Sequence, residues 1–203
     1  RRTETAEVTL EANPRTLLRR KLIALRDGLG VNRLSLGAQS FNPRVLKILG
    51  RVHRPEDIPK AVALARDVGI ESVSLDLIFA VPGQTHADLR DDIDSLLRLN
   101  PDHVSCYCLT IEAGTAFQRD VDAGQLKPTS NDWQGRQFAY VRHRLRAAGF
   151  VHYEISNFAK PGALCRHNLT YWRNHPSHGI GNGAASHLGG IRRMNHRDVL
   201  EYV

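Results

Sequence analysis

The sequence contains few cysteines and no long apolar run, and both absences narrow the class of protein it can encode. Its three cysteines, Cys106, Cys108 and Cys165, are too few for a disulfide-stapled secreted domain, which favours a reducing compartment. No apolar stretch approaches the roughly 20 residues of a membrane span. The first five residues are polar and lack the apolar core of a secretory signal. We therefore expect a cytoplasmic protein without a transmembrane segment.

Aromatic residues are also scarce, at 6% of the 203 residues, whereas the net charge is +7. Positive charge suggests an anionic partner, and nucleic acid is the first class to consider because Lys and Arg bind phosphates. The arginines are spread along expected helices, however, as in Arg142, Arg144 and Arg146, without the interleaved aromatic residues of a single-strand binder. We expect no nucleic-acid partner, and a small carboxylate or phosphate ligand fits the charge equally well.

Strand-like and helix-like patterns alternate along the first two thirds of the chain, which is typical of βαβ units with a parallel sheet. The expected strands are 8–12, 32–38, 72–81 and 103–110. The expected helices are 14–28, 43–49, 55–68, 85–100 and 131–148. The fold class is therefore α/β.

Four local patterns carry more specific expectations. Asn13 followed by Pro14 predicts the N-cap and first turn of the first helix. The nearly continuous apolar run 72–81 predicts a strand covered on both faces. Thr85 and Asp88 have the spacing of a capping box, with Asp where Glu or Gln is usual. The run VHYEISNFA, residues 151–159, is strand-like along its whole length.

The sequence pattern changes after residue 129. Residues 1–129 hold the βα units, and residues 130–203 hold the last helix, the strand-like run and a loop-rich extension. Four parallel strands are too few to close a barrel, and the chain starts directly in a strand. We therefore expect a chain truncated at both ends.

A row of polar residues, one per strand–helix unit, stands in or just after the apolar runs. Its members are Glu11, Gln39, Asp76 and Thr110. Because the carboxyl ends of parallel strands meet on one face, where ligand sites lie, these side chains predict a wall of ligand contacts. Arg51, just after a helix, could reach a carboxylate with two hydrogen bonds. For each residue alone, a structural role such as a buried hydrogen bond or a surface ion pair is the simpler alternative.

Histidines cluster in the loop-rich segment. They are His167, His175, His178 and His187. Histidine is a common ligand of iron and zinc. The Cys/His pairs of a structural zinc site are absent from the sequence, so exposed loop histidines are the simpler interpretation for the last three.

Six strings, taken together and in order, resemble a known family. The strings LEANP, NRLSLGAQSF, LGRVH, DLIFAVPGQT, YEISNFA and HNLTYW are similar to the radical S-adenosylmethionine (radical SAM) proteins related to oxygen-independent coproporphyrinogen III oxidase. The resemblance spans nearly the whole chain, and the H-N-x-x-Y-W string resembles the heme-chaperone branch. It implies part of a (β/α)6 TIM-like barrel with a parallel sheet and a small loop-rich extension.

The resemblance also implies cofactors and site residues. It implies S-adenosylmethionine and a [4Fe–4S] cluster at the carboxyl-terminal face of the barrel. The residues that match the S-adenosylmethionine pocket are Glu11, which would contact the ribose, together with Gln39, Arg51, Asp76 and Thr110. The residues that match the heme-binding motif are His167, as the ligand of heme iron, with Asn168, Tyr171 and Trp172.

The resemblance and the composition together leave three possible functions. The first is a heme chaperone that binds heme and passes it to an unidentified acceptor protein. The second is an oxygen-independent coproporphyrinogen III oxidase, so whether the protein is an enzyme stays open, as does a dimeric state. A basic nucleic-acid-binding α/β domain is the third.

Two departures from the family pattern stand out. The C-x-x-x-C-x-x-C motif that holds the cluster is absent, and Cys106, Cys108 and Cys165 stand at other spacings. Residues 1–203 alone are therefore expected to assemble no cluster and to perform no radical chemistry. Ala80 stands where a Gly is usual after DLIF, so we expect a local backbone rearrangement there.

Overall fold

The computed structural model describes residues 5–203 and divides the chain into two compact units. The first unit ends at Leu164, and the second comprises Cys165–Val203. The helix and the strand-like run expected after residue 129 thus pack within the first unit. The compact boundary lies at 164/165, whereas the sequence pattern changes at 129/130.

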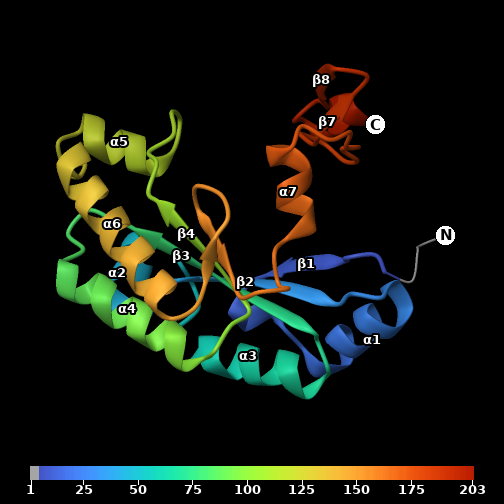
Figure 1. The fold of residues 1–203 in the computed structure, drawn as a ribbon. Helices are drawn as coiled ribbons and strands as arrows, with labels where there is room; N and C mark the ends of the chain where they lie inside the picture. The colour runs from blue at the N-terminus through green and yellow to red at the C-terminus, as the bar shows by residue number, and fades with distance from the viewer. Residues whose placement is uncertain (1–4) are drawn as a thin grey trace. The chain divides into compact units, whose positions relative to one another are not determined.

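A six-stranded sheet forms the centre of the first unit (Figure 1). Its spatial order is β1-β2-β3-β4-β6-β5. Strands β1 to β4 are parallel, and β6 runs antiparallel to both β4 and β5. The parallel α/β fold expected from the sequence is confirmed. The strands are β1 Thr9–Ala12, β2 Arg33–Gln39, β3 Ser72–Phe79, β4 His103–Cys108, β5 Val151–His152 and β6 Asn157–Ala159.

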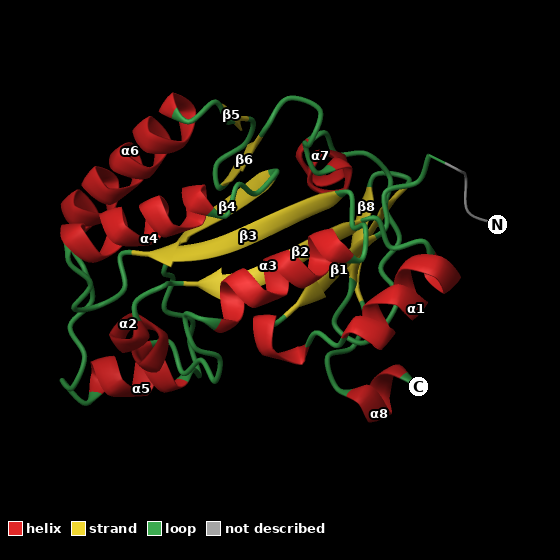
Figure 2. Ribbon diagram, turned by 90° about the horizontal axis from the view of Figure 1, so that it is seen from below, coloured by secondary structure: helices red, strands yellow, loops and turns green. Residues whose placement is uncertain are grey.

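Helices cover one face of this sheet (Figures 1 and 2). Leu22, Ile58, Ile93 and Leu145, from four different helices, all lie in one apolar core with side chains of β2, β3, β4 and β6. The elements between the strands are the 3-10 turn Pro14–Thr16, α1 Arg19–Leu29, α2 Pro43–Ile48, α3 Asp57–Asp67, α4 His86–Arg98, α5 Ala116–Asp122 and α6 Asn131–Ala147.

The two faces of each central strand differ in polarity. In β3, Val73, Leu75, Leu77 and Phe79 are buried in the apolar core. The alternate positions are Ser72, Ser74, Asp76 and Ile78. No residue of β3 is exposed, so the strand is covered on both faces as expected, but the second face carries mainly polar side chains because side chains alternate across a sheet.

The first helix begins later than the sequence indicated. Asn13 does act as an N-cap, since its side chain accepts a hydrogen bond from the Arg15 amide, but it caps only the 3-10 turn. Leu17 and Leu18 then have extended backbones, and α1 starts at Arg19. Gly30, in the left-handed conformation, ends the helix.

Two other local expectations, the capping box and the strand at residues 151–159, can be compared with the structure. The capping box of Thr85 and Asp88 is present in both directions. Residues 151–159 form a hairpin of two short strands, β5 and β6, instead of one strand. The turn at residues 153–156 reverses the chain, so β6 can pair with β4.

The second unit is small and consists of two helices and one hairpin. Its elements are α7 Arg166–Trp172, β7 Ala185–Leu188, β8 Ile191–Met194 and α8 Val199–Tyr202. Across residues 5–203, none of the helices is long and apolar enough to span a bilayer.

Candidate functional site

Asp76 lies in the middle of β3 on the polar face of the sheet. The Ser35 hydroxyl donates to its carboxylate, with Oγ–Oδ1 3.1 Å, and Ser105 adds a second hydrogen bond. Burial raises the pKa of Asp76 to about 6, although these hydrogen bonds oppose the shift. The nearby Glu11 carboxylate raises this pKa further. Polar residues of β1 to β4 therefore meet on one face.

Gln39 joins this face through an unusual backbone. Its φ is +64°, and its side chain folds back over Gly37. A Cβ at Gly37 would lie 2.6 Å from Gln39 Nε2, so only glycine leaves room for the amide. The side-chain amide of Gln39, held above Gly37, thus offers a hydrogen-bond donor and an acceptor at the carboxyl end of β2.

The other three residues of the expected pocket are all exposed, but they lie in different parts of the first unit. Glu11 is exposed on β1, and Arg51 is exposed in the loop between α2 and α3. Thr110 is exposed after β4 and lines a cavity of 430 Å³ with Ala80 and Gln134. The structure thus brings Glu11, Gln39 and Asp76 to one face, and Thr110 lines a cavity beyond the carboxyl end of β4.

His53 is a structural partner of this site that the sequence analysis did not single out. It is buried, its Nε2 lies 3.0 Å from the Ala38 carbonyl oxygen, and its Nδ1 lies 3.4 Å from the Asn13 side chain. It thereby ties the ends of β1 and β2 together beside Gln39. The LGRVH string contained this residue, but only the fold shows what it contacts.

Asp92 of α4 is a second missed residue. Its buried carboxylate accepts hydrogen bonds from the Ser40 hydroxyl, at 2.8 Å, and from the Phe41 amide, at 2.6 Å. The Gln84 side chain donates to it at 3.4 Å. Burial raises the pKa of Asp92 to about 6. This carboxylate joins the loops that follow β2 and β3, next to Gln39.

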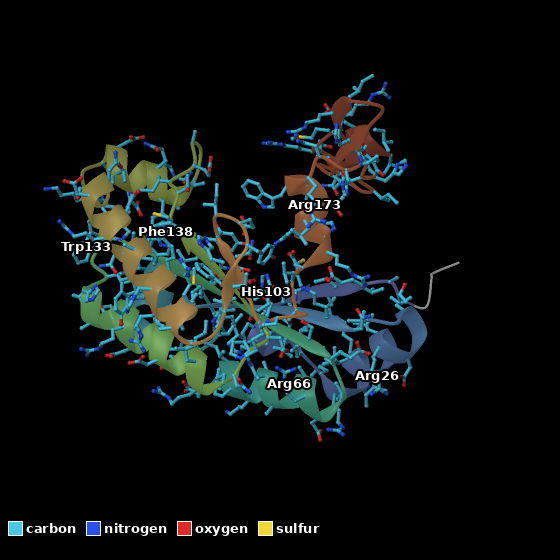
Figure 3. All side chains as sticks on the ribbon, in the orientation of Figure 1. Arg26, Arg66, His103, Trp133, Phe138 and Arg173 are labelled. Carbon is cyan, nitrogen blue, oxygen red and sulfur yellow. The ribbon has the colours of Figure 1, made fainter. Side chains whose placement is uncertain are left out.

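His103 closes the polar face near the start of β4 (Figure 3). Its two ring nitrogens lie 2.8 Å from the Ser74 hydroxyl and 2.8 Å from the Tyr153 hydroxyl. Burial lowers the pKa of His103 to about 3, so the ring is neutral at pH 7. The ring acts as a hydrogen-bonded structural group.

Helix α7 carries the residues of the H-N-x-x-Y-W string. His167 and Tyr171, four residues apart, contact edge to face with ring centroids 4.7 Å apart. Both are exposed, and so is Trp172, at 52%. Asn168 is half-buried on the same helix. The helix therefore presents an imidazole and two large aromatic rings together.

The cysteines do not form a cluster site. Cys106 and Cys108 lie in β4, where burial raises the pKa of both thiols and opposes the thiolate that iron requires. Cys165 belongs to the other compact unit. Within the described part of the chain, no three His, Cys, Asp or Glu side chains converge as a metal site. The cysteines present do not fit a [4Fe–4S] cluster.

The fold and the polar face define an α/β domain with a mostly parallel, open sheet, and comparison with known proteins identifies its family. Residues 1–96 match the model of the Radical SAM superfamily. The structure resembles that of the coproporphyrinogen III oxidase of Escherichia coli, a radical SAM enzyme, with a TM-score of 0.80 and 25% sequence identity. The match covers 96% of this chain and 47% of that chain.

The sequence relatives are more specific. Identity is 40% to the heme chaperone HemW of Bacillus subtilis, over 98% of this chain and 52% of the relative. It is 41% to the heme chaperone HemW of Escherichia coli K12, over 88% of this chain and 46% of the relative. The chain belongs to the radical SAM superfamily, whose model its first 96 residues match, and it is similar to these heme chaperones over most of its length, as the sequence strings indicated. It spans about half the length of the curated relatives it matches.

Family membership implies S-adenosylmethionine and a [4Fe–4S] cluster as cofactors. The polar face fits the first of these, because Gly37 leaves a space that a Cβ would fill and Gln39 and Asp76 offer donors and acceptors there. The cluster ligands are not among the described cysteines.

Proposed function

We propose that the protein to which this chain belongs is a cytoplasmic heme chaperone, which binds heme and transfers it to an acceptor protein. Two kinds of observation support this proposal. The relatives at about 40% identity are named heme chaperones, and none of the three cysteines takes part in a disulfide, as is usual in a reducing compartment.

Helix α7 is the observation that carries the heme assignment. An exposed imidazole is a sound axial ligand for heme iron, and His167 offers one. The exposed rings of Tyr171 and Trp172 can pack against a flat porphyrin. Asn168, on the same helix, completes the proposed heme-binding set.

The polar face of the sheet is the proposed S-adenosylmethionine site. Glu11, Gln39 and Asp76 would hold the nucleoside, with Arg51 and Thr110 as further contacts. S-adenosylmethionine supplies radical chemistry when it binds beside a reduced cluster. The contribution of this chain is to position the nucleoside through preformed acceptors and the Gln39 amide.

Heme titration of the full-length protein tests the proposal. His167→Ala should weaken heme binding at least tenfold and shift the heme absorption spectrum, because the axial nitrogen is lost. His178→Ala is the matched control, since His178 is exposed but lies outside α7. Unchanged affinity and an unchanged spectrum in His167→Ala would remove His167 from the heme site.

A coproporphyrinogen III oxidase is the second candidate, favoured by the TM-score of 0.80 to that enzyme. The two functions separate in an anaerobic assay of the reconstituted full-length protein with coproporphyrinogen III. A chaperone should leave the propionate groups intact. Sustained decarboxylation of the substrate would overturn the chaperone proposal.

A further inference from the structure

Residues 155–197 contain no aspartate or glutamate, although the chain as a whole has 21 acidic residues. Over the same range stand six lysine and arginine residues and five of the ten histidines. Elsewhere the two signs are mixed, as in the ion pair of Arg144 with Asp94. A region that carries charge of one sign attracts ligands of the opposite sign. The range therefore points to an anionic ligand of the second unit, which supplies most of it.

The arginines of the β7–β8 hairpin are not neutralised by carboxylates. Among residues 5–203, neither Arg192 nor Arg193 forms an ion pair. The two acidic residues of the second unit serve the region of α8 instead, because Asp198 caps that helix and Glu201 pairs with His196. Both arginines are exposed. Their charge is therefore available to a ligand.

Arg192 is held at the carboxyl end of α7 (Figure 1). Its Nη2 donates to Oδ1 of Asn174 at 2.6 Å, and the Asn174 amide donates to the Tyr171 carbonyl oxygen at 3.0 Å. An arginine carries five N–H donors, of which this bond uses one. The two hydrogen bonds place a guanidinium group beside the end of α7 that carries the exposed rings of Tyr171 and Trp172.

The two neighbouring arginines of β8 point to opposite faces of the hairpin, because side chains alternate along a strand. Arg192 pairs directly with His187 of β7, and directly paired residues project from the same face. A neutral imidazole still has one N–H donor, so His187 adds a second donor on the face of Arg192. Arg193 carries the same charge on the other face.

We propose that Arg192, held by Asn174, binds a propionate carboxylate of the heme whose iron His167 would ligate. This inference rests on the proposed heme site. The seven residues from His167 to Asn174 extend over about two helical turns, roughly 10 Å, and the propionates of a heme likewise lie at the rim of the macrocycle, away from the iron. A guanidinium group binds a carboxylate through two parallel, charge-assisted hydrogen bonds.

The experiment titrates the full-length protein with hemin and with hemin dimethyl ester, both in the same nonionic detergent, and follows the heme absorption. The ester keeps the iron and the macrocycle but has no free carboxylate. Arg192→Gln should raise the Kd of hemin about tenfold and leave that of the ester within twofold. The heme spectrum should not change, because the axial ligand is untouched. Arg192→Lys, which keeps the charge but loses the planar fork, should raise the Kd of hemin by a smaller factor.

Arg193→Gln is the matched control, because Arg193 has the same charge on the opposite face and should leave both Kd values within twofold. The propionate subsite is overturned if Arg192→Gln weakens neither compound or both equally, or if Arg193→Gln acts as strongly, while the heme proposal stands. If the unaltered protein binds neither compound, both proposals are overturned. Thermal unfolding of each variant shows whether the fold is kept, and if Arg192→Gln unfolds, Arg192→Lys decides by the same criterion.

Discussion

Leu75 and Asp76 are neighbours in β3, yet they belong to two regions with opposite chemistry. Leu75 is fully buried among helix side chains, where apolar area removed from water stabilises the fold. Asp76 faces the polar side, where burial raises its pKa to about 6. One face of the sheet thus supplies stability, and the other holds groups whose burial is costly without a ligand. The contrast locates the region in which a buried charge opposes stability.

The largest expected effect is the loss of stability when a side chain on the apolar face is truncated. Leu75→Ala removes a fully buried side chain and should lower the free energy of unfolding by about 3–5 kcal/mol. Leu18→Ala is the control, because Leu18 is 53% exposed and should cost well under half as much. Urea denaturation measures both. Equal losses would mean that the helix-covered face does not dominate stability.

The pH dependence of stability in Asp76→Asn tests how much the buried charge on the polar face costs. The folded-state pKa of Asp76, about 6, exceeds the usual 3.8, so the folded state binds more protons between these values and stability falls as pH rises from about 4 to 6. The variant should therefore be more stable at pH 7.5, by on the order of 2 kcal/mol. Part of the pH dependence should remain, because Asp92 shifts in the same direction.

Urea denaturation from pH 4 to 7.5 measures this effect. Asp91→Asn serves as the control, since Asp91 is an exposed residue on α4 and should change little. A variant at Asp76 that is less stable than the original at pH 7.5 would show that its hydrogen bonds outweigh the cost of burying the charge.

Gly37→Ala sharpens the comparison by moving one side chain on the polar face. The new methyl would displace the flexible end of Gln39 at little cost in stability, and S-adenosylmethionine binding by the full-length protein should weaken about tenfold, or about 1.4 kcal/mol. Gly28→Ala is the control, because a Cβ there meets nothing within 4 Å. Unchanged affinity in Gly37→Ala would exclude Gln39 from the site.

The smallest expected effect concerns Ala80, at the end of the apolar face. Its φ is +59°, which glycine adopts freely. In Ala80→Gly, relief of this strain should offset the lost methyl burial and the added chain entropy, for a net change within about 0.5 kcal/mol. Ala63→Gly, on the exposed side of α3, should cost about 1 kcal/mol. Thermal unfolding decides, and an equal loss in both variants would contradict strain at Ala80.

Sequence pattern was sufficient for the elements whose signals are local. Strand-like apolar runs located β2 and β3, and the spacing of Thr85 and Asp88 predicted a capping box that the structure contains. Asn42 and Pro43 stand at the start of α2. The start of α1 was missed because Leu17 and Leu18 fit a helical stripe, while their observed backbones are extended. At Ala80, where a local backbone rearrangement was expected because Gly is usual there, φ is +59°, a conformation that glycine adopts freely.

The parts of the site that depend on distant contacts could not be predicted. His53 and Asp92 act through partners about 15 to 50 residues away in sequence, such as the carbonyl of Ala38 and the hydroxyl of Ser40. The antiparallel β6 depends on a turn that brings Asn157 beside Ser105. Only the fold decides such pairs, whereas the roles of Glu11, Gln39, Arg51, Asp76, Thr110 and His167 stay predictions.

The most direct test of two separate sites is a paired titration of the full-length protein. Heme and S-adenosylmethionine affinities are measured for the original protein, Asp76→Asn and His167→Ala. We predict that Asp76→Asn weakens only S-adenosylmethionine, about tenfold or more, and that His167→Ala weakens only heme. Loss of both ligands in either variant, or of neither ligand in both, would contradict the assignment of the polar face to the nucleoside and of α7 to heme.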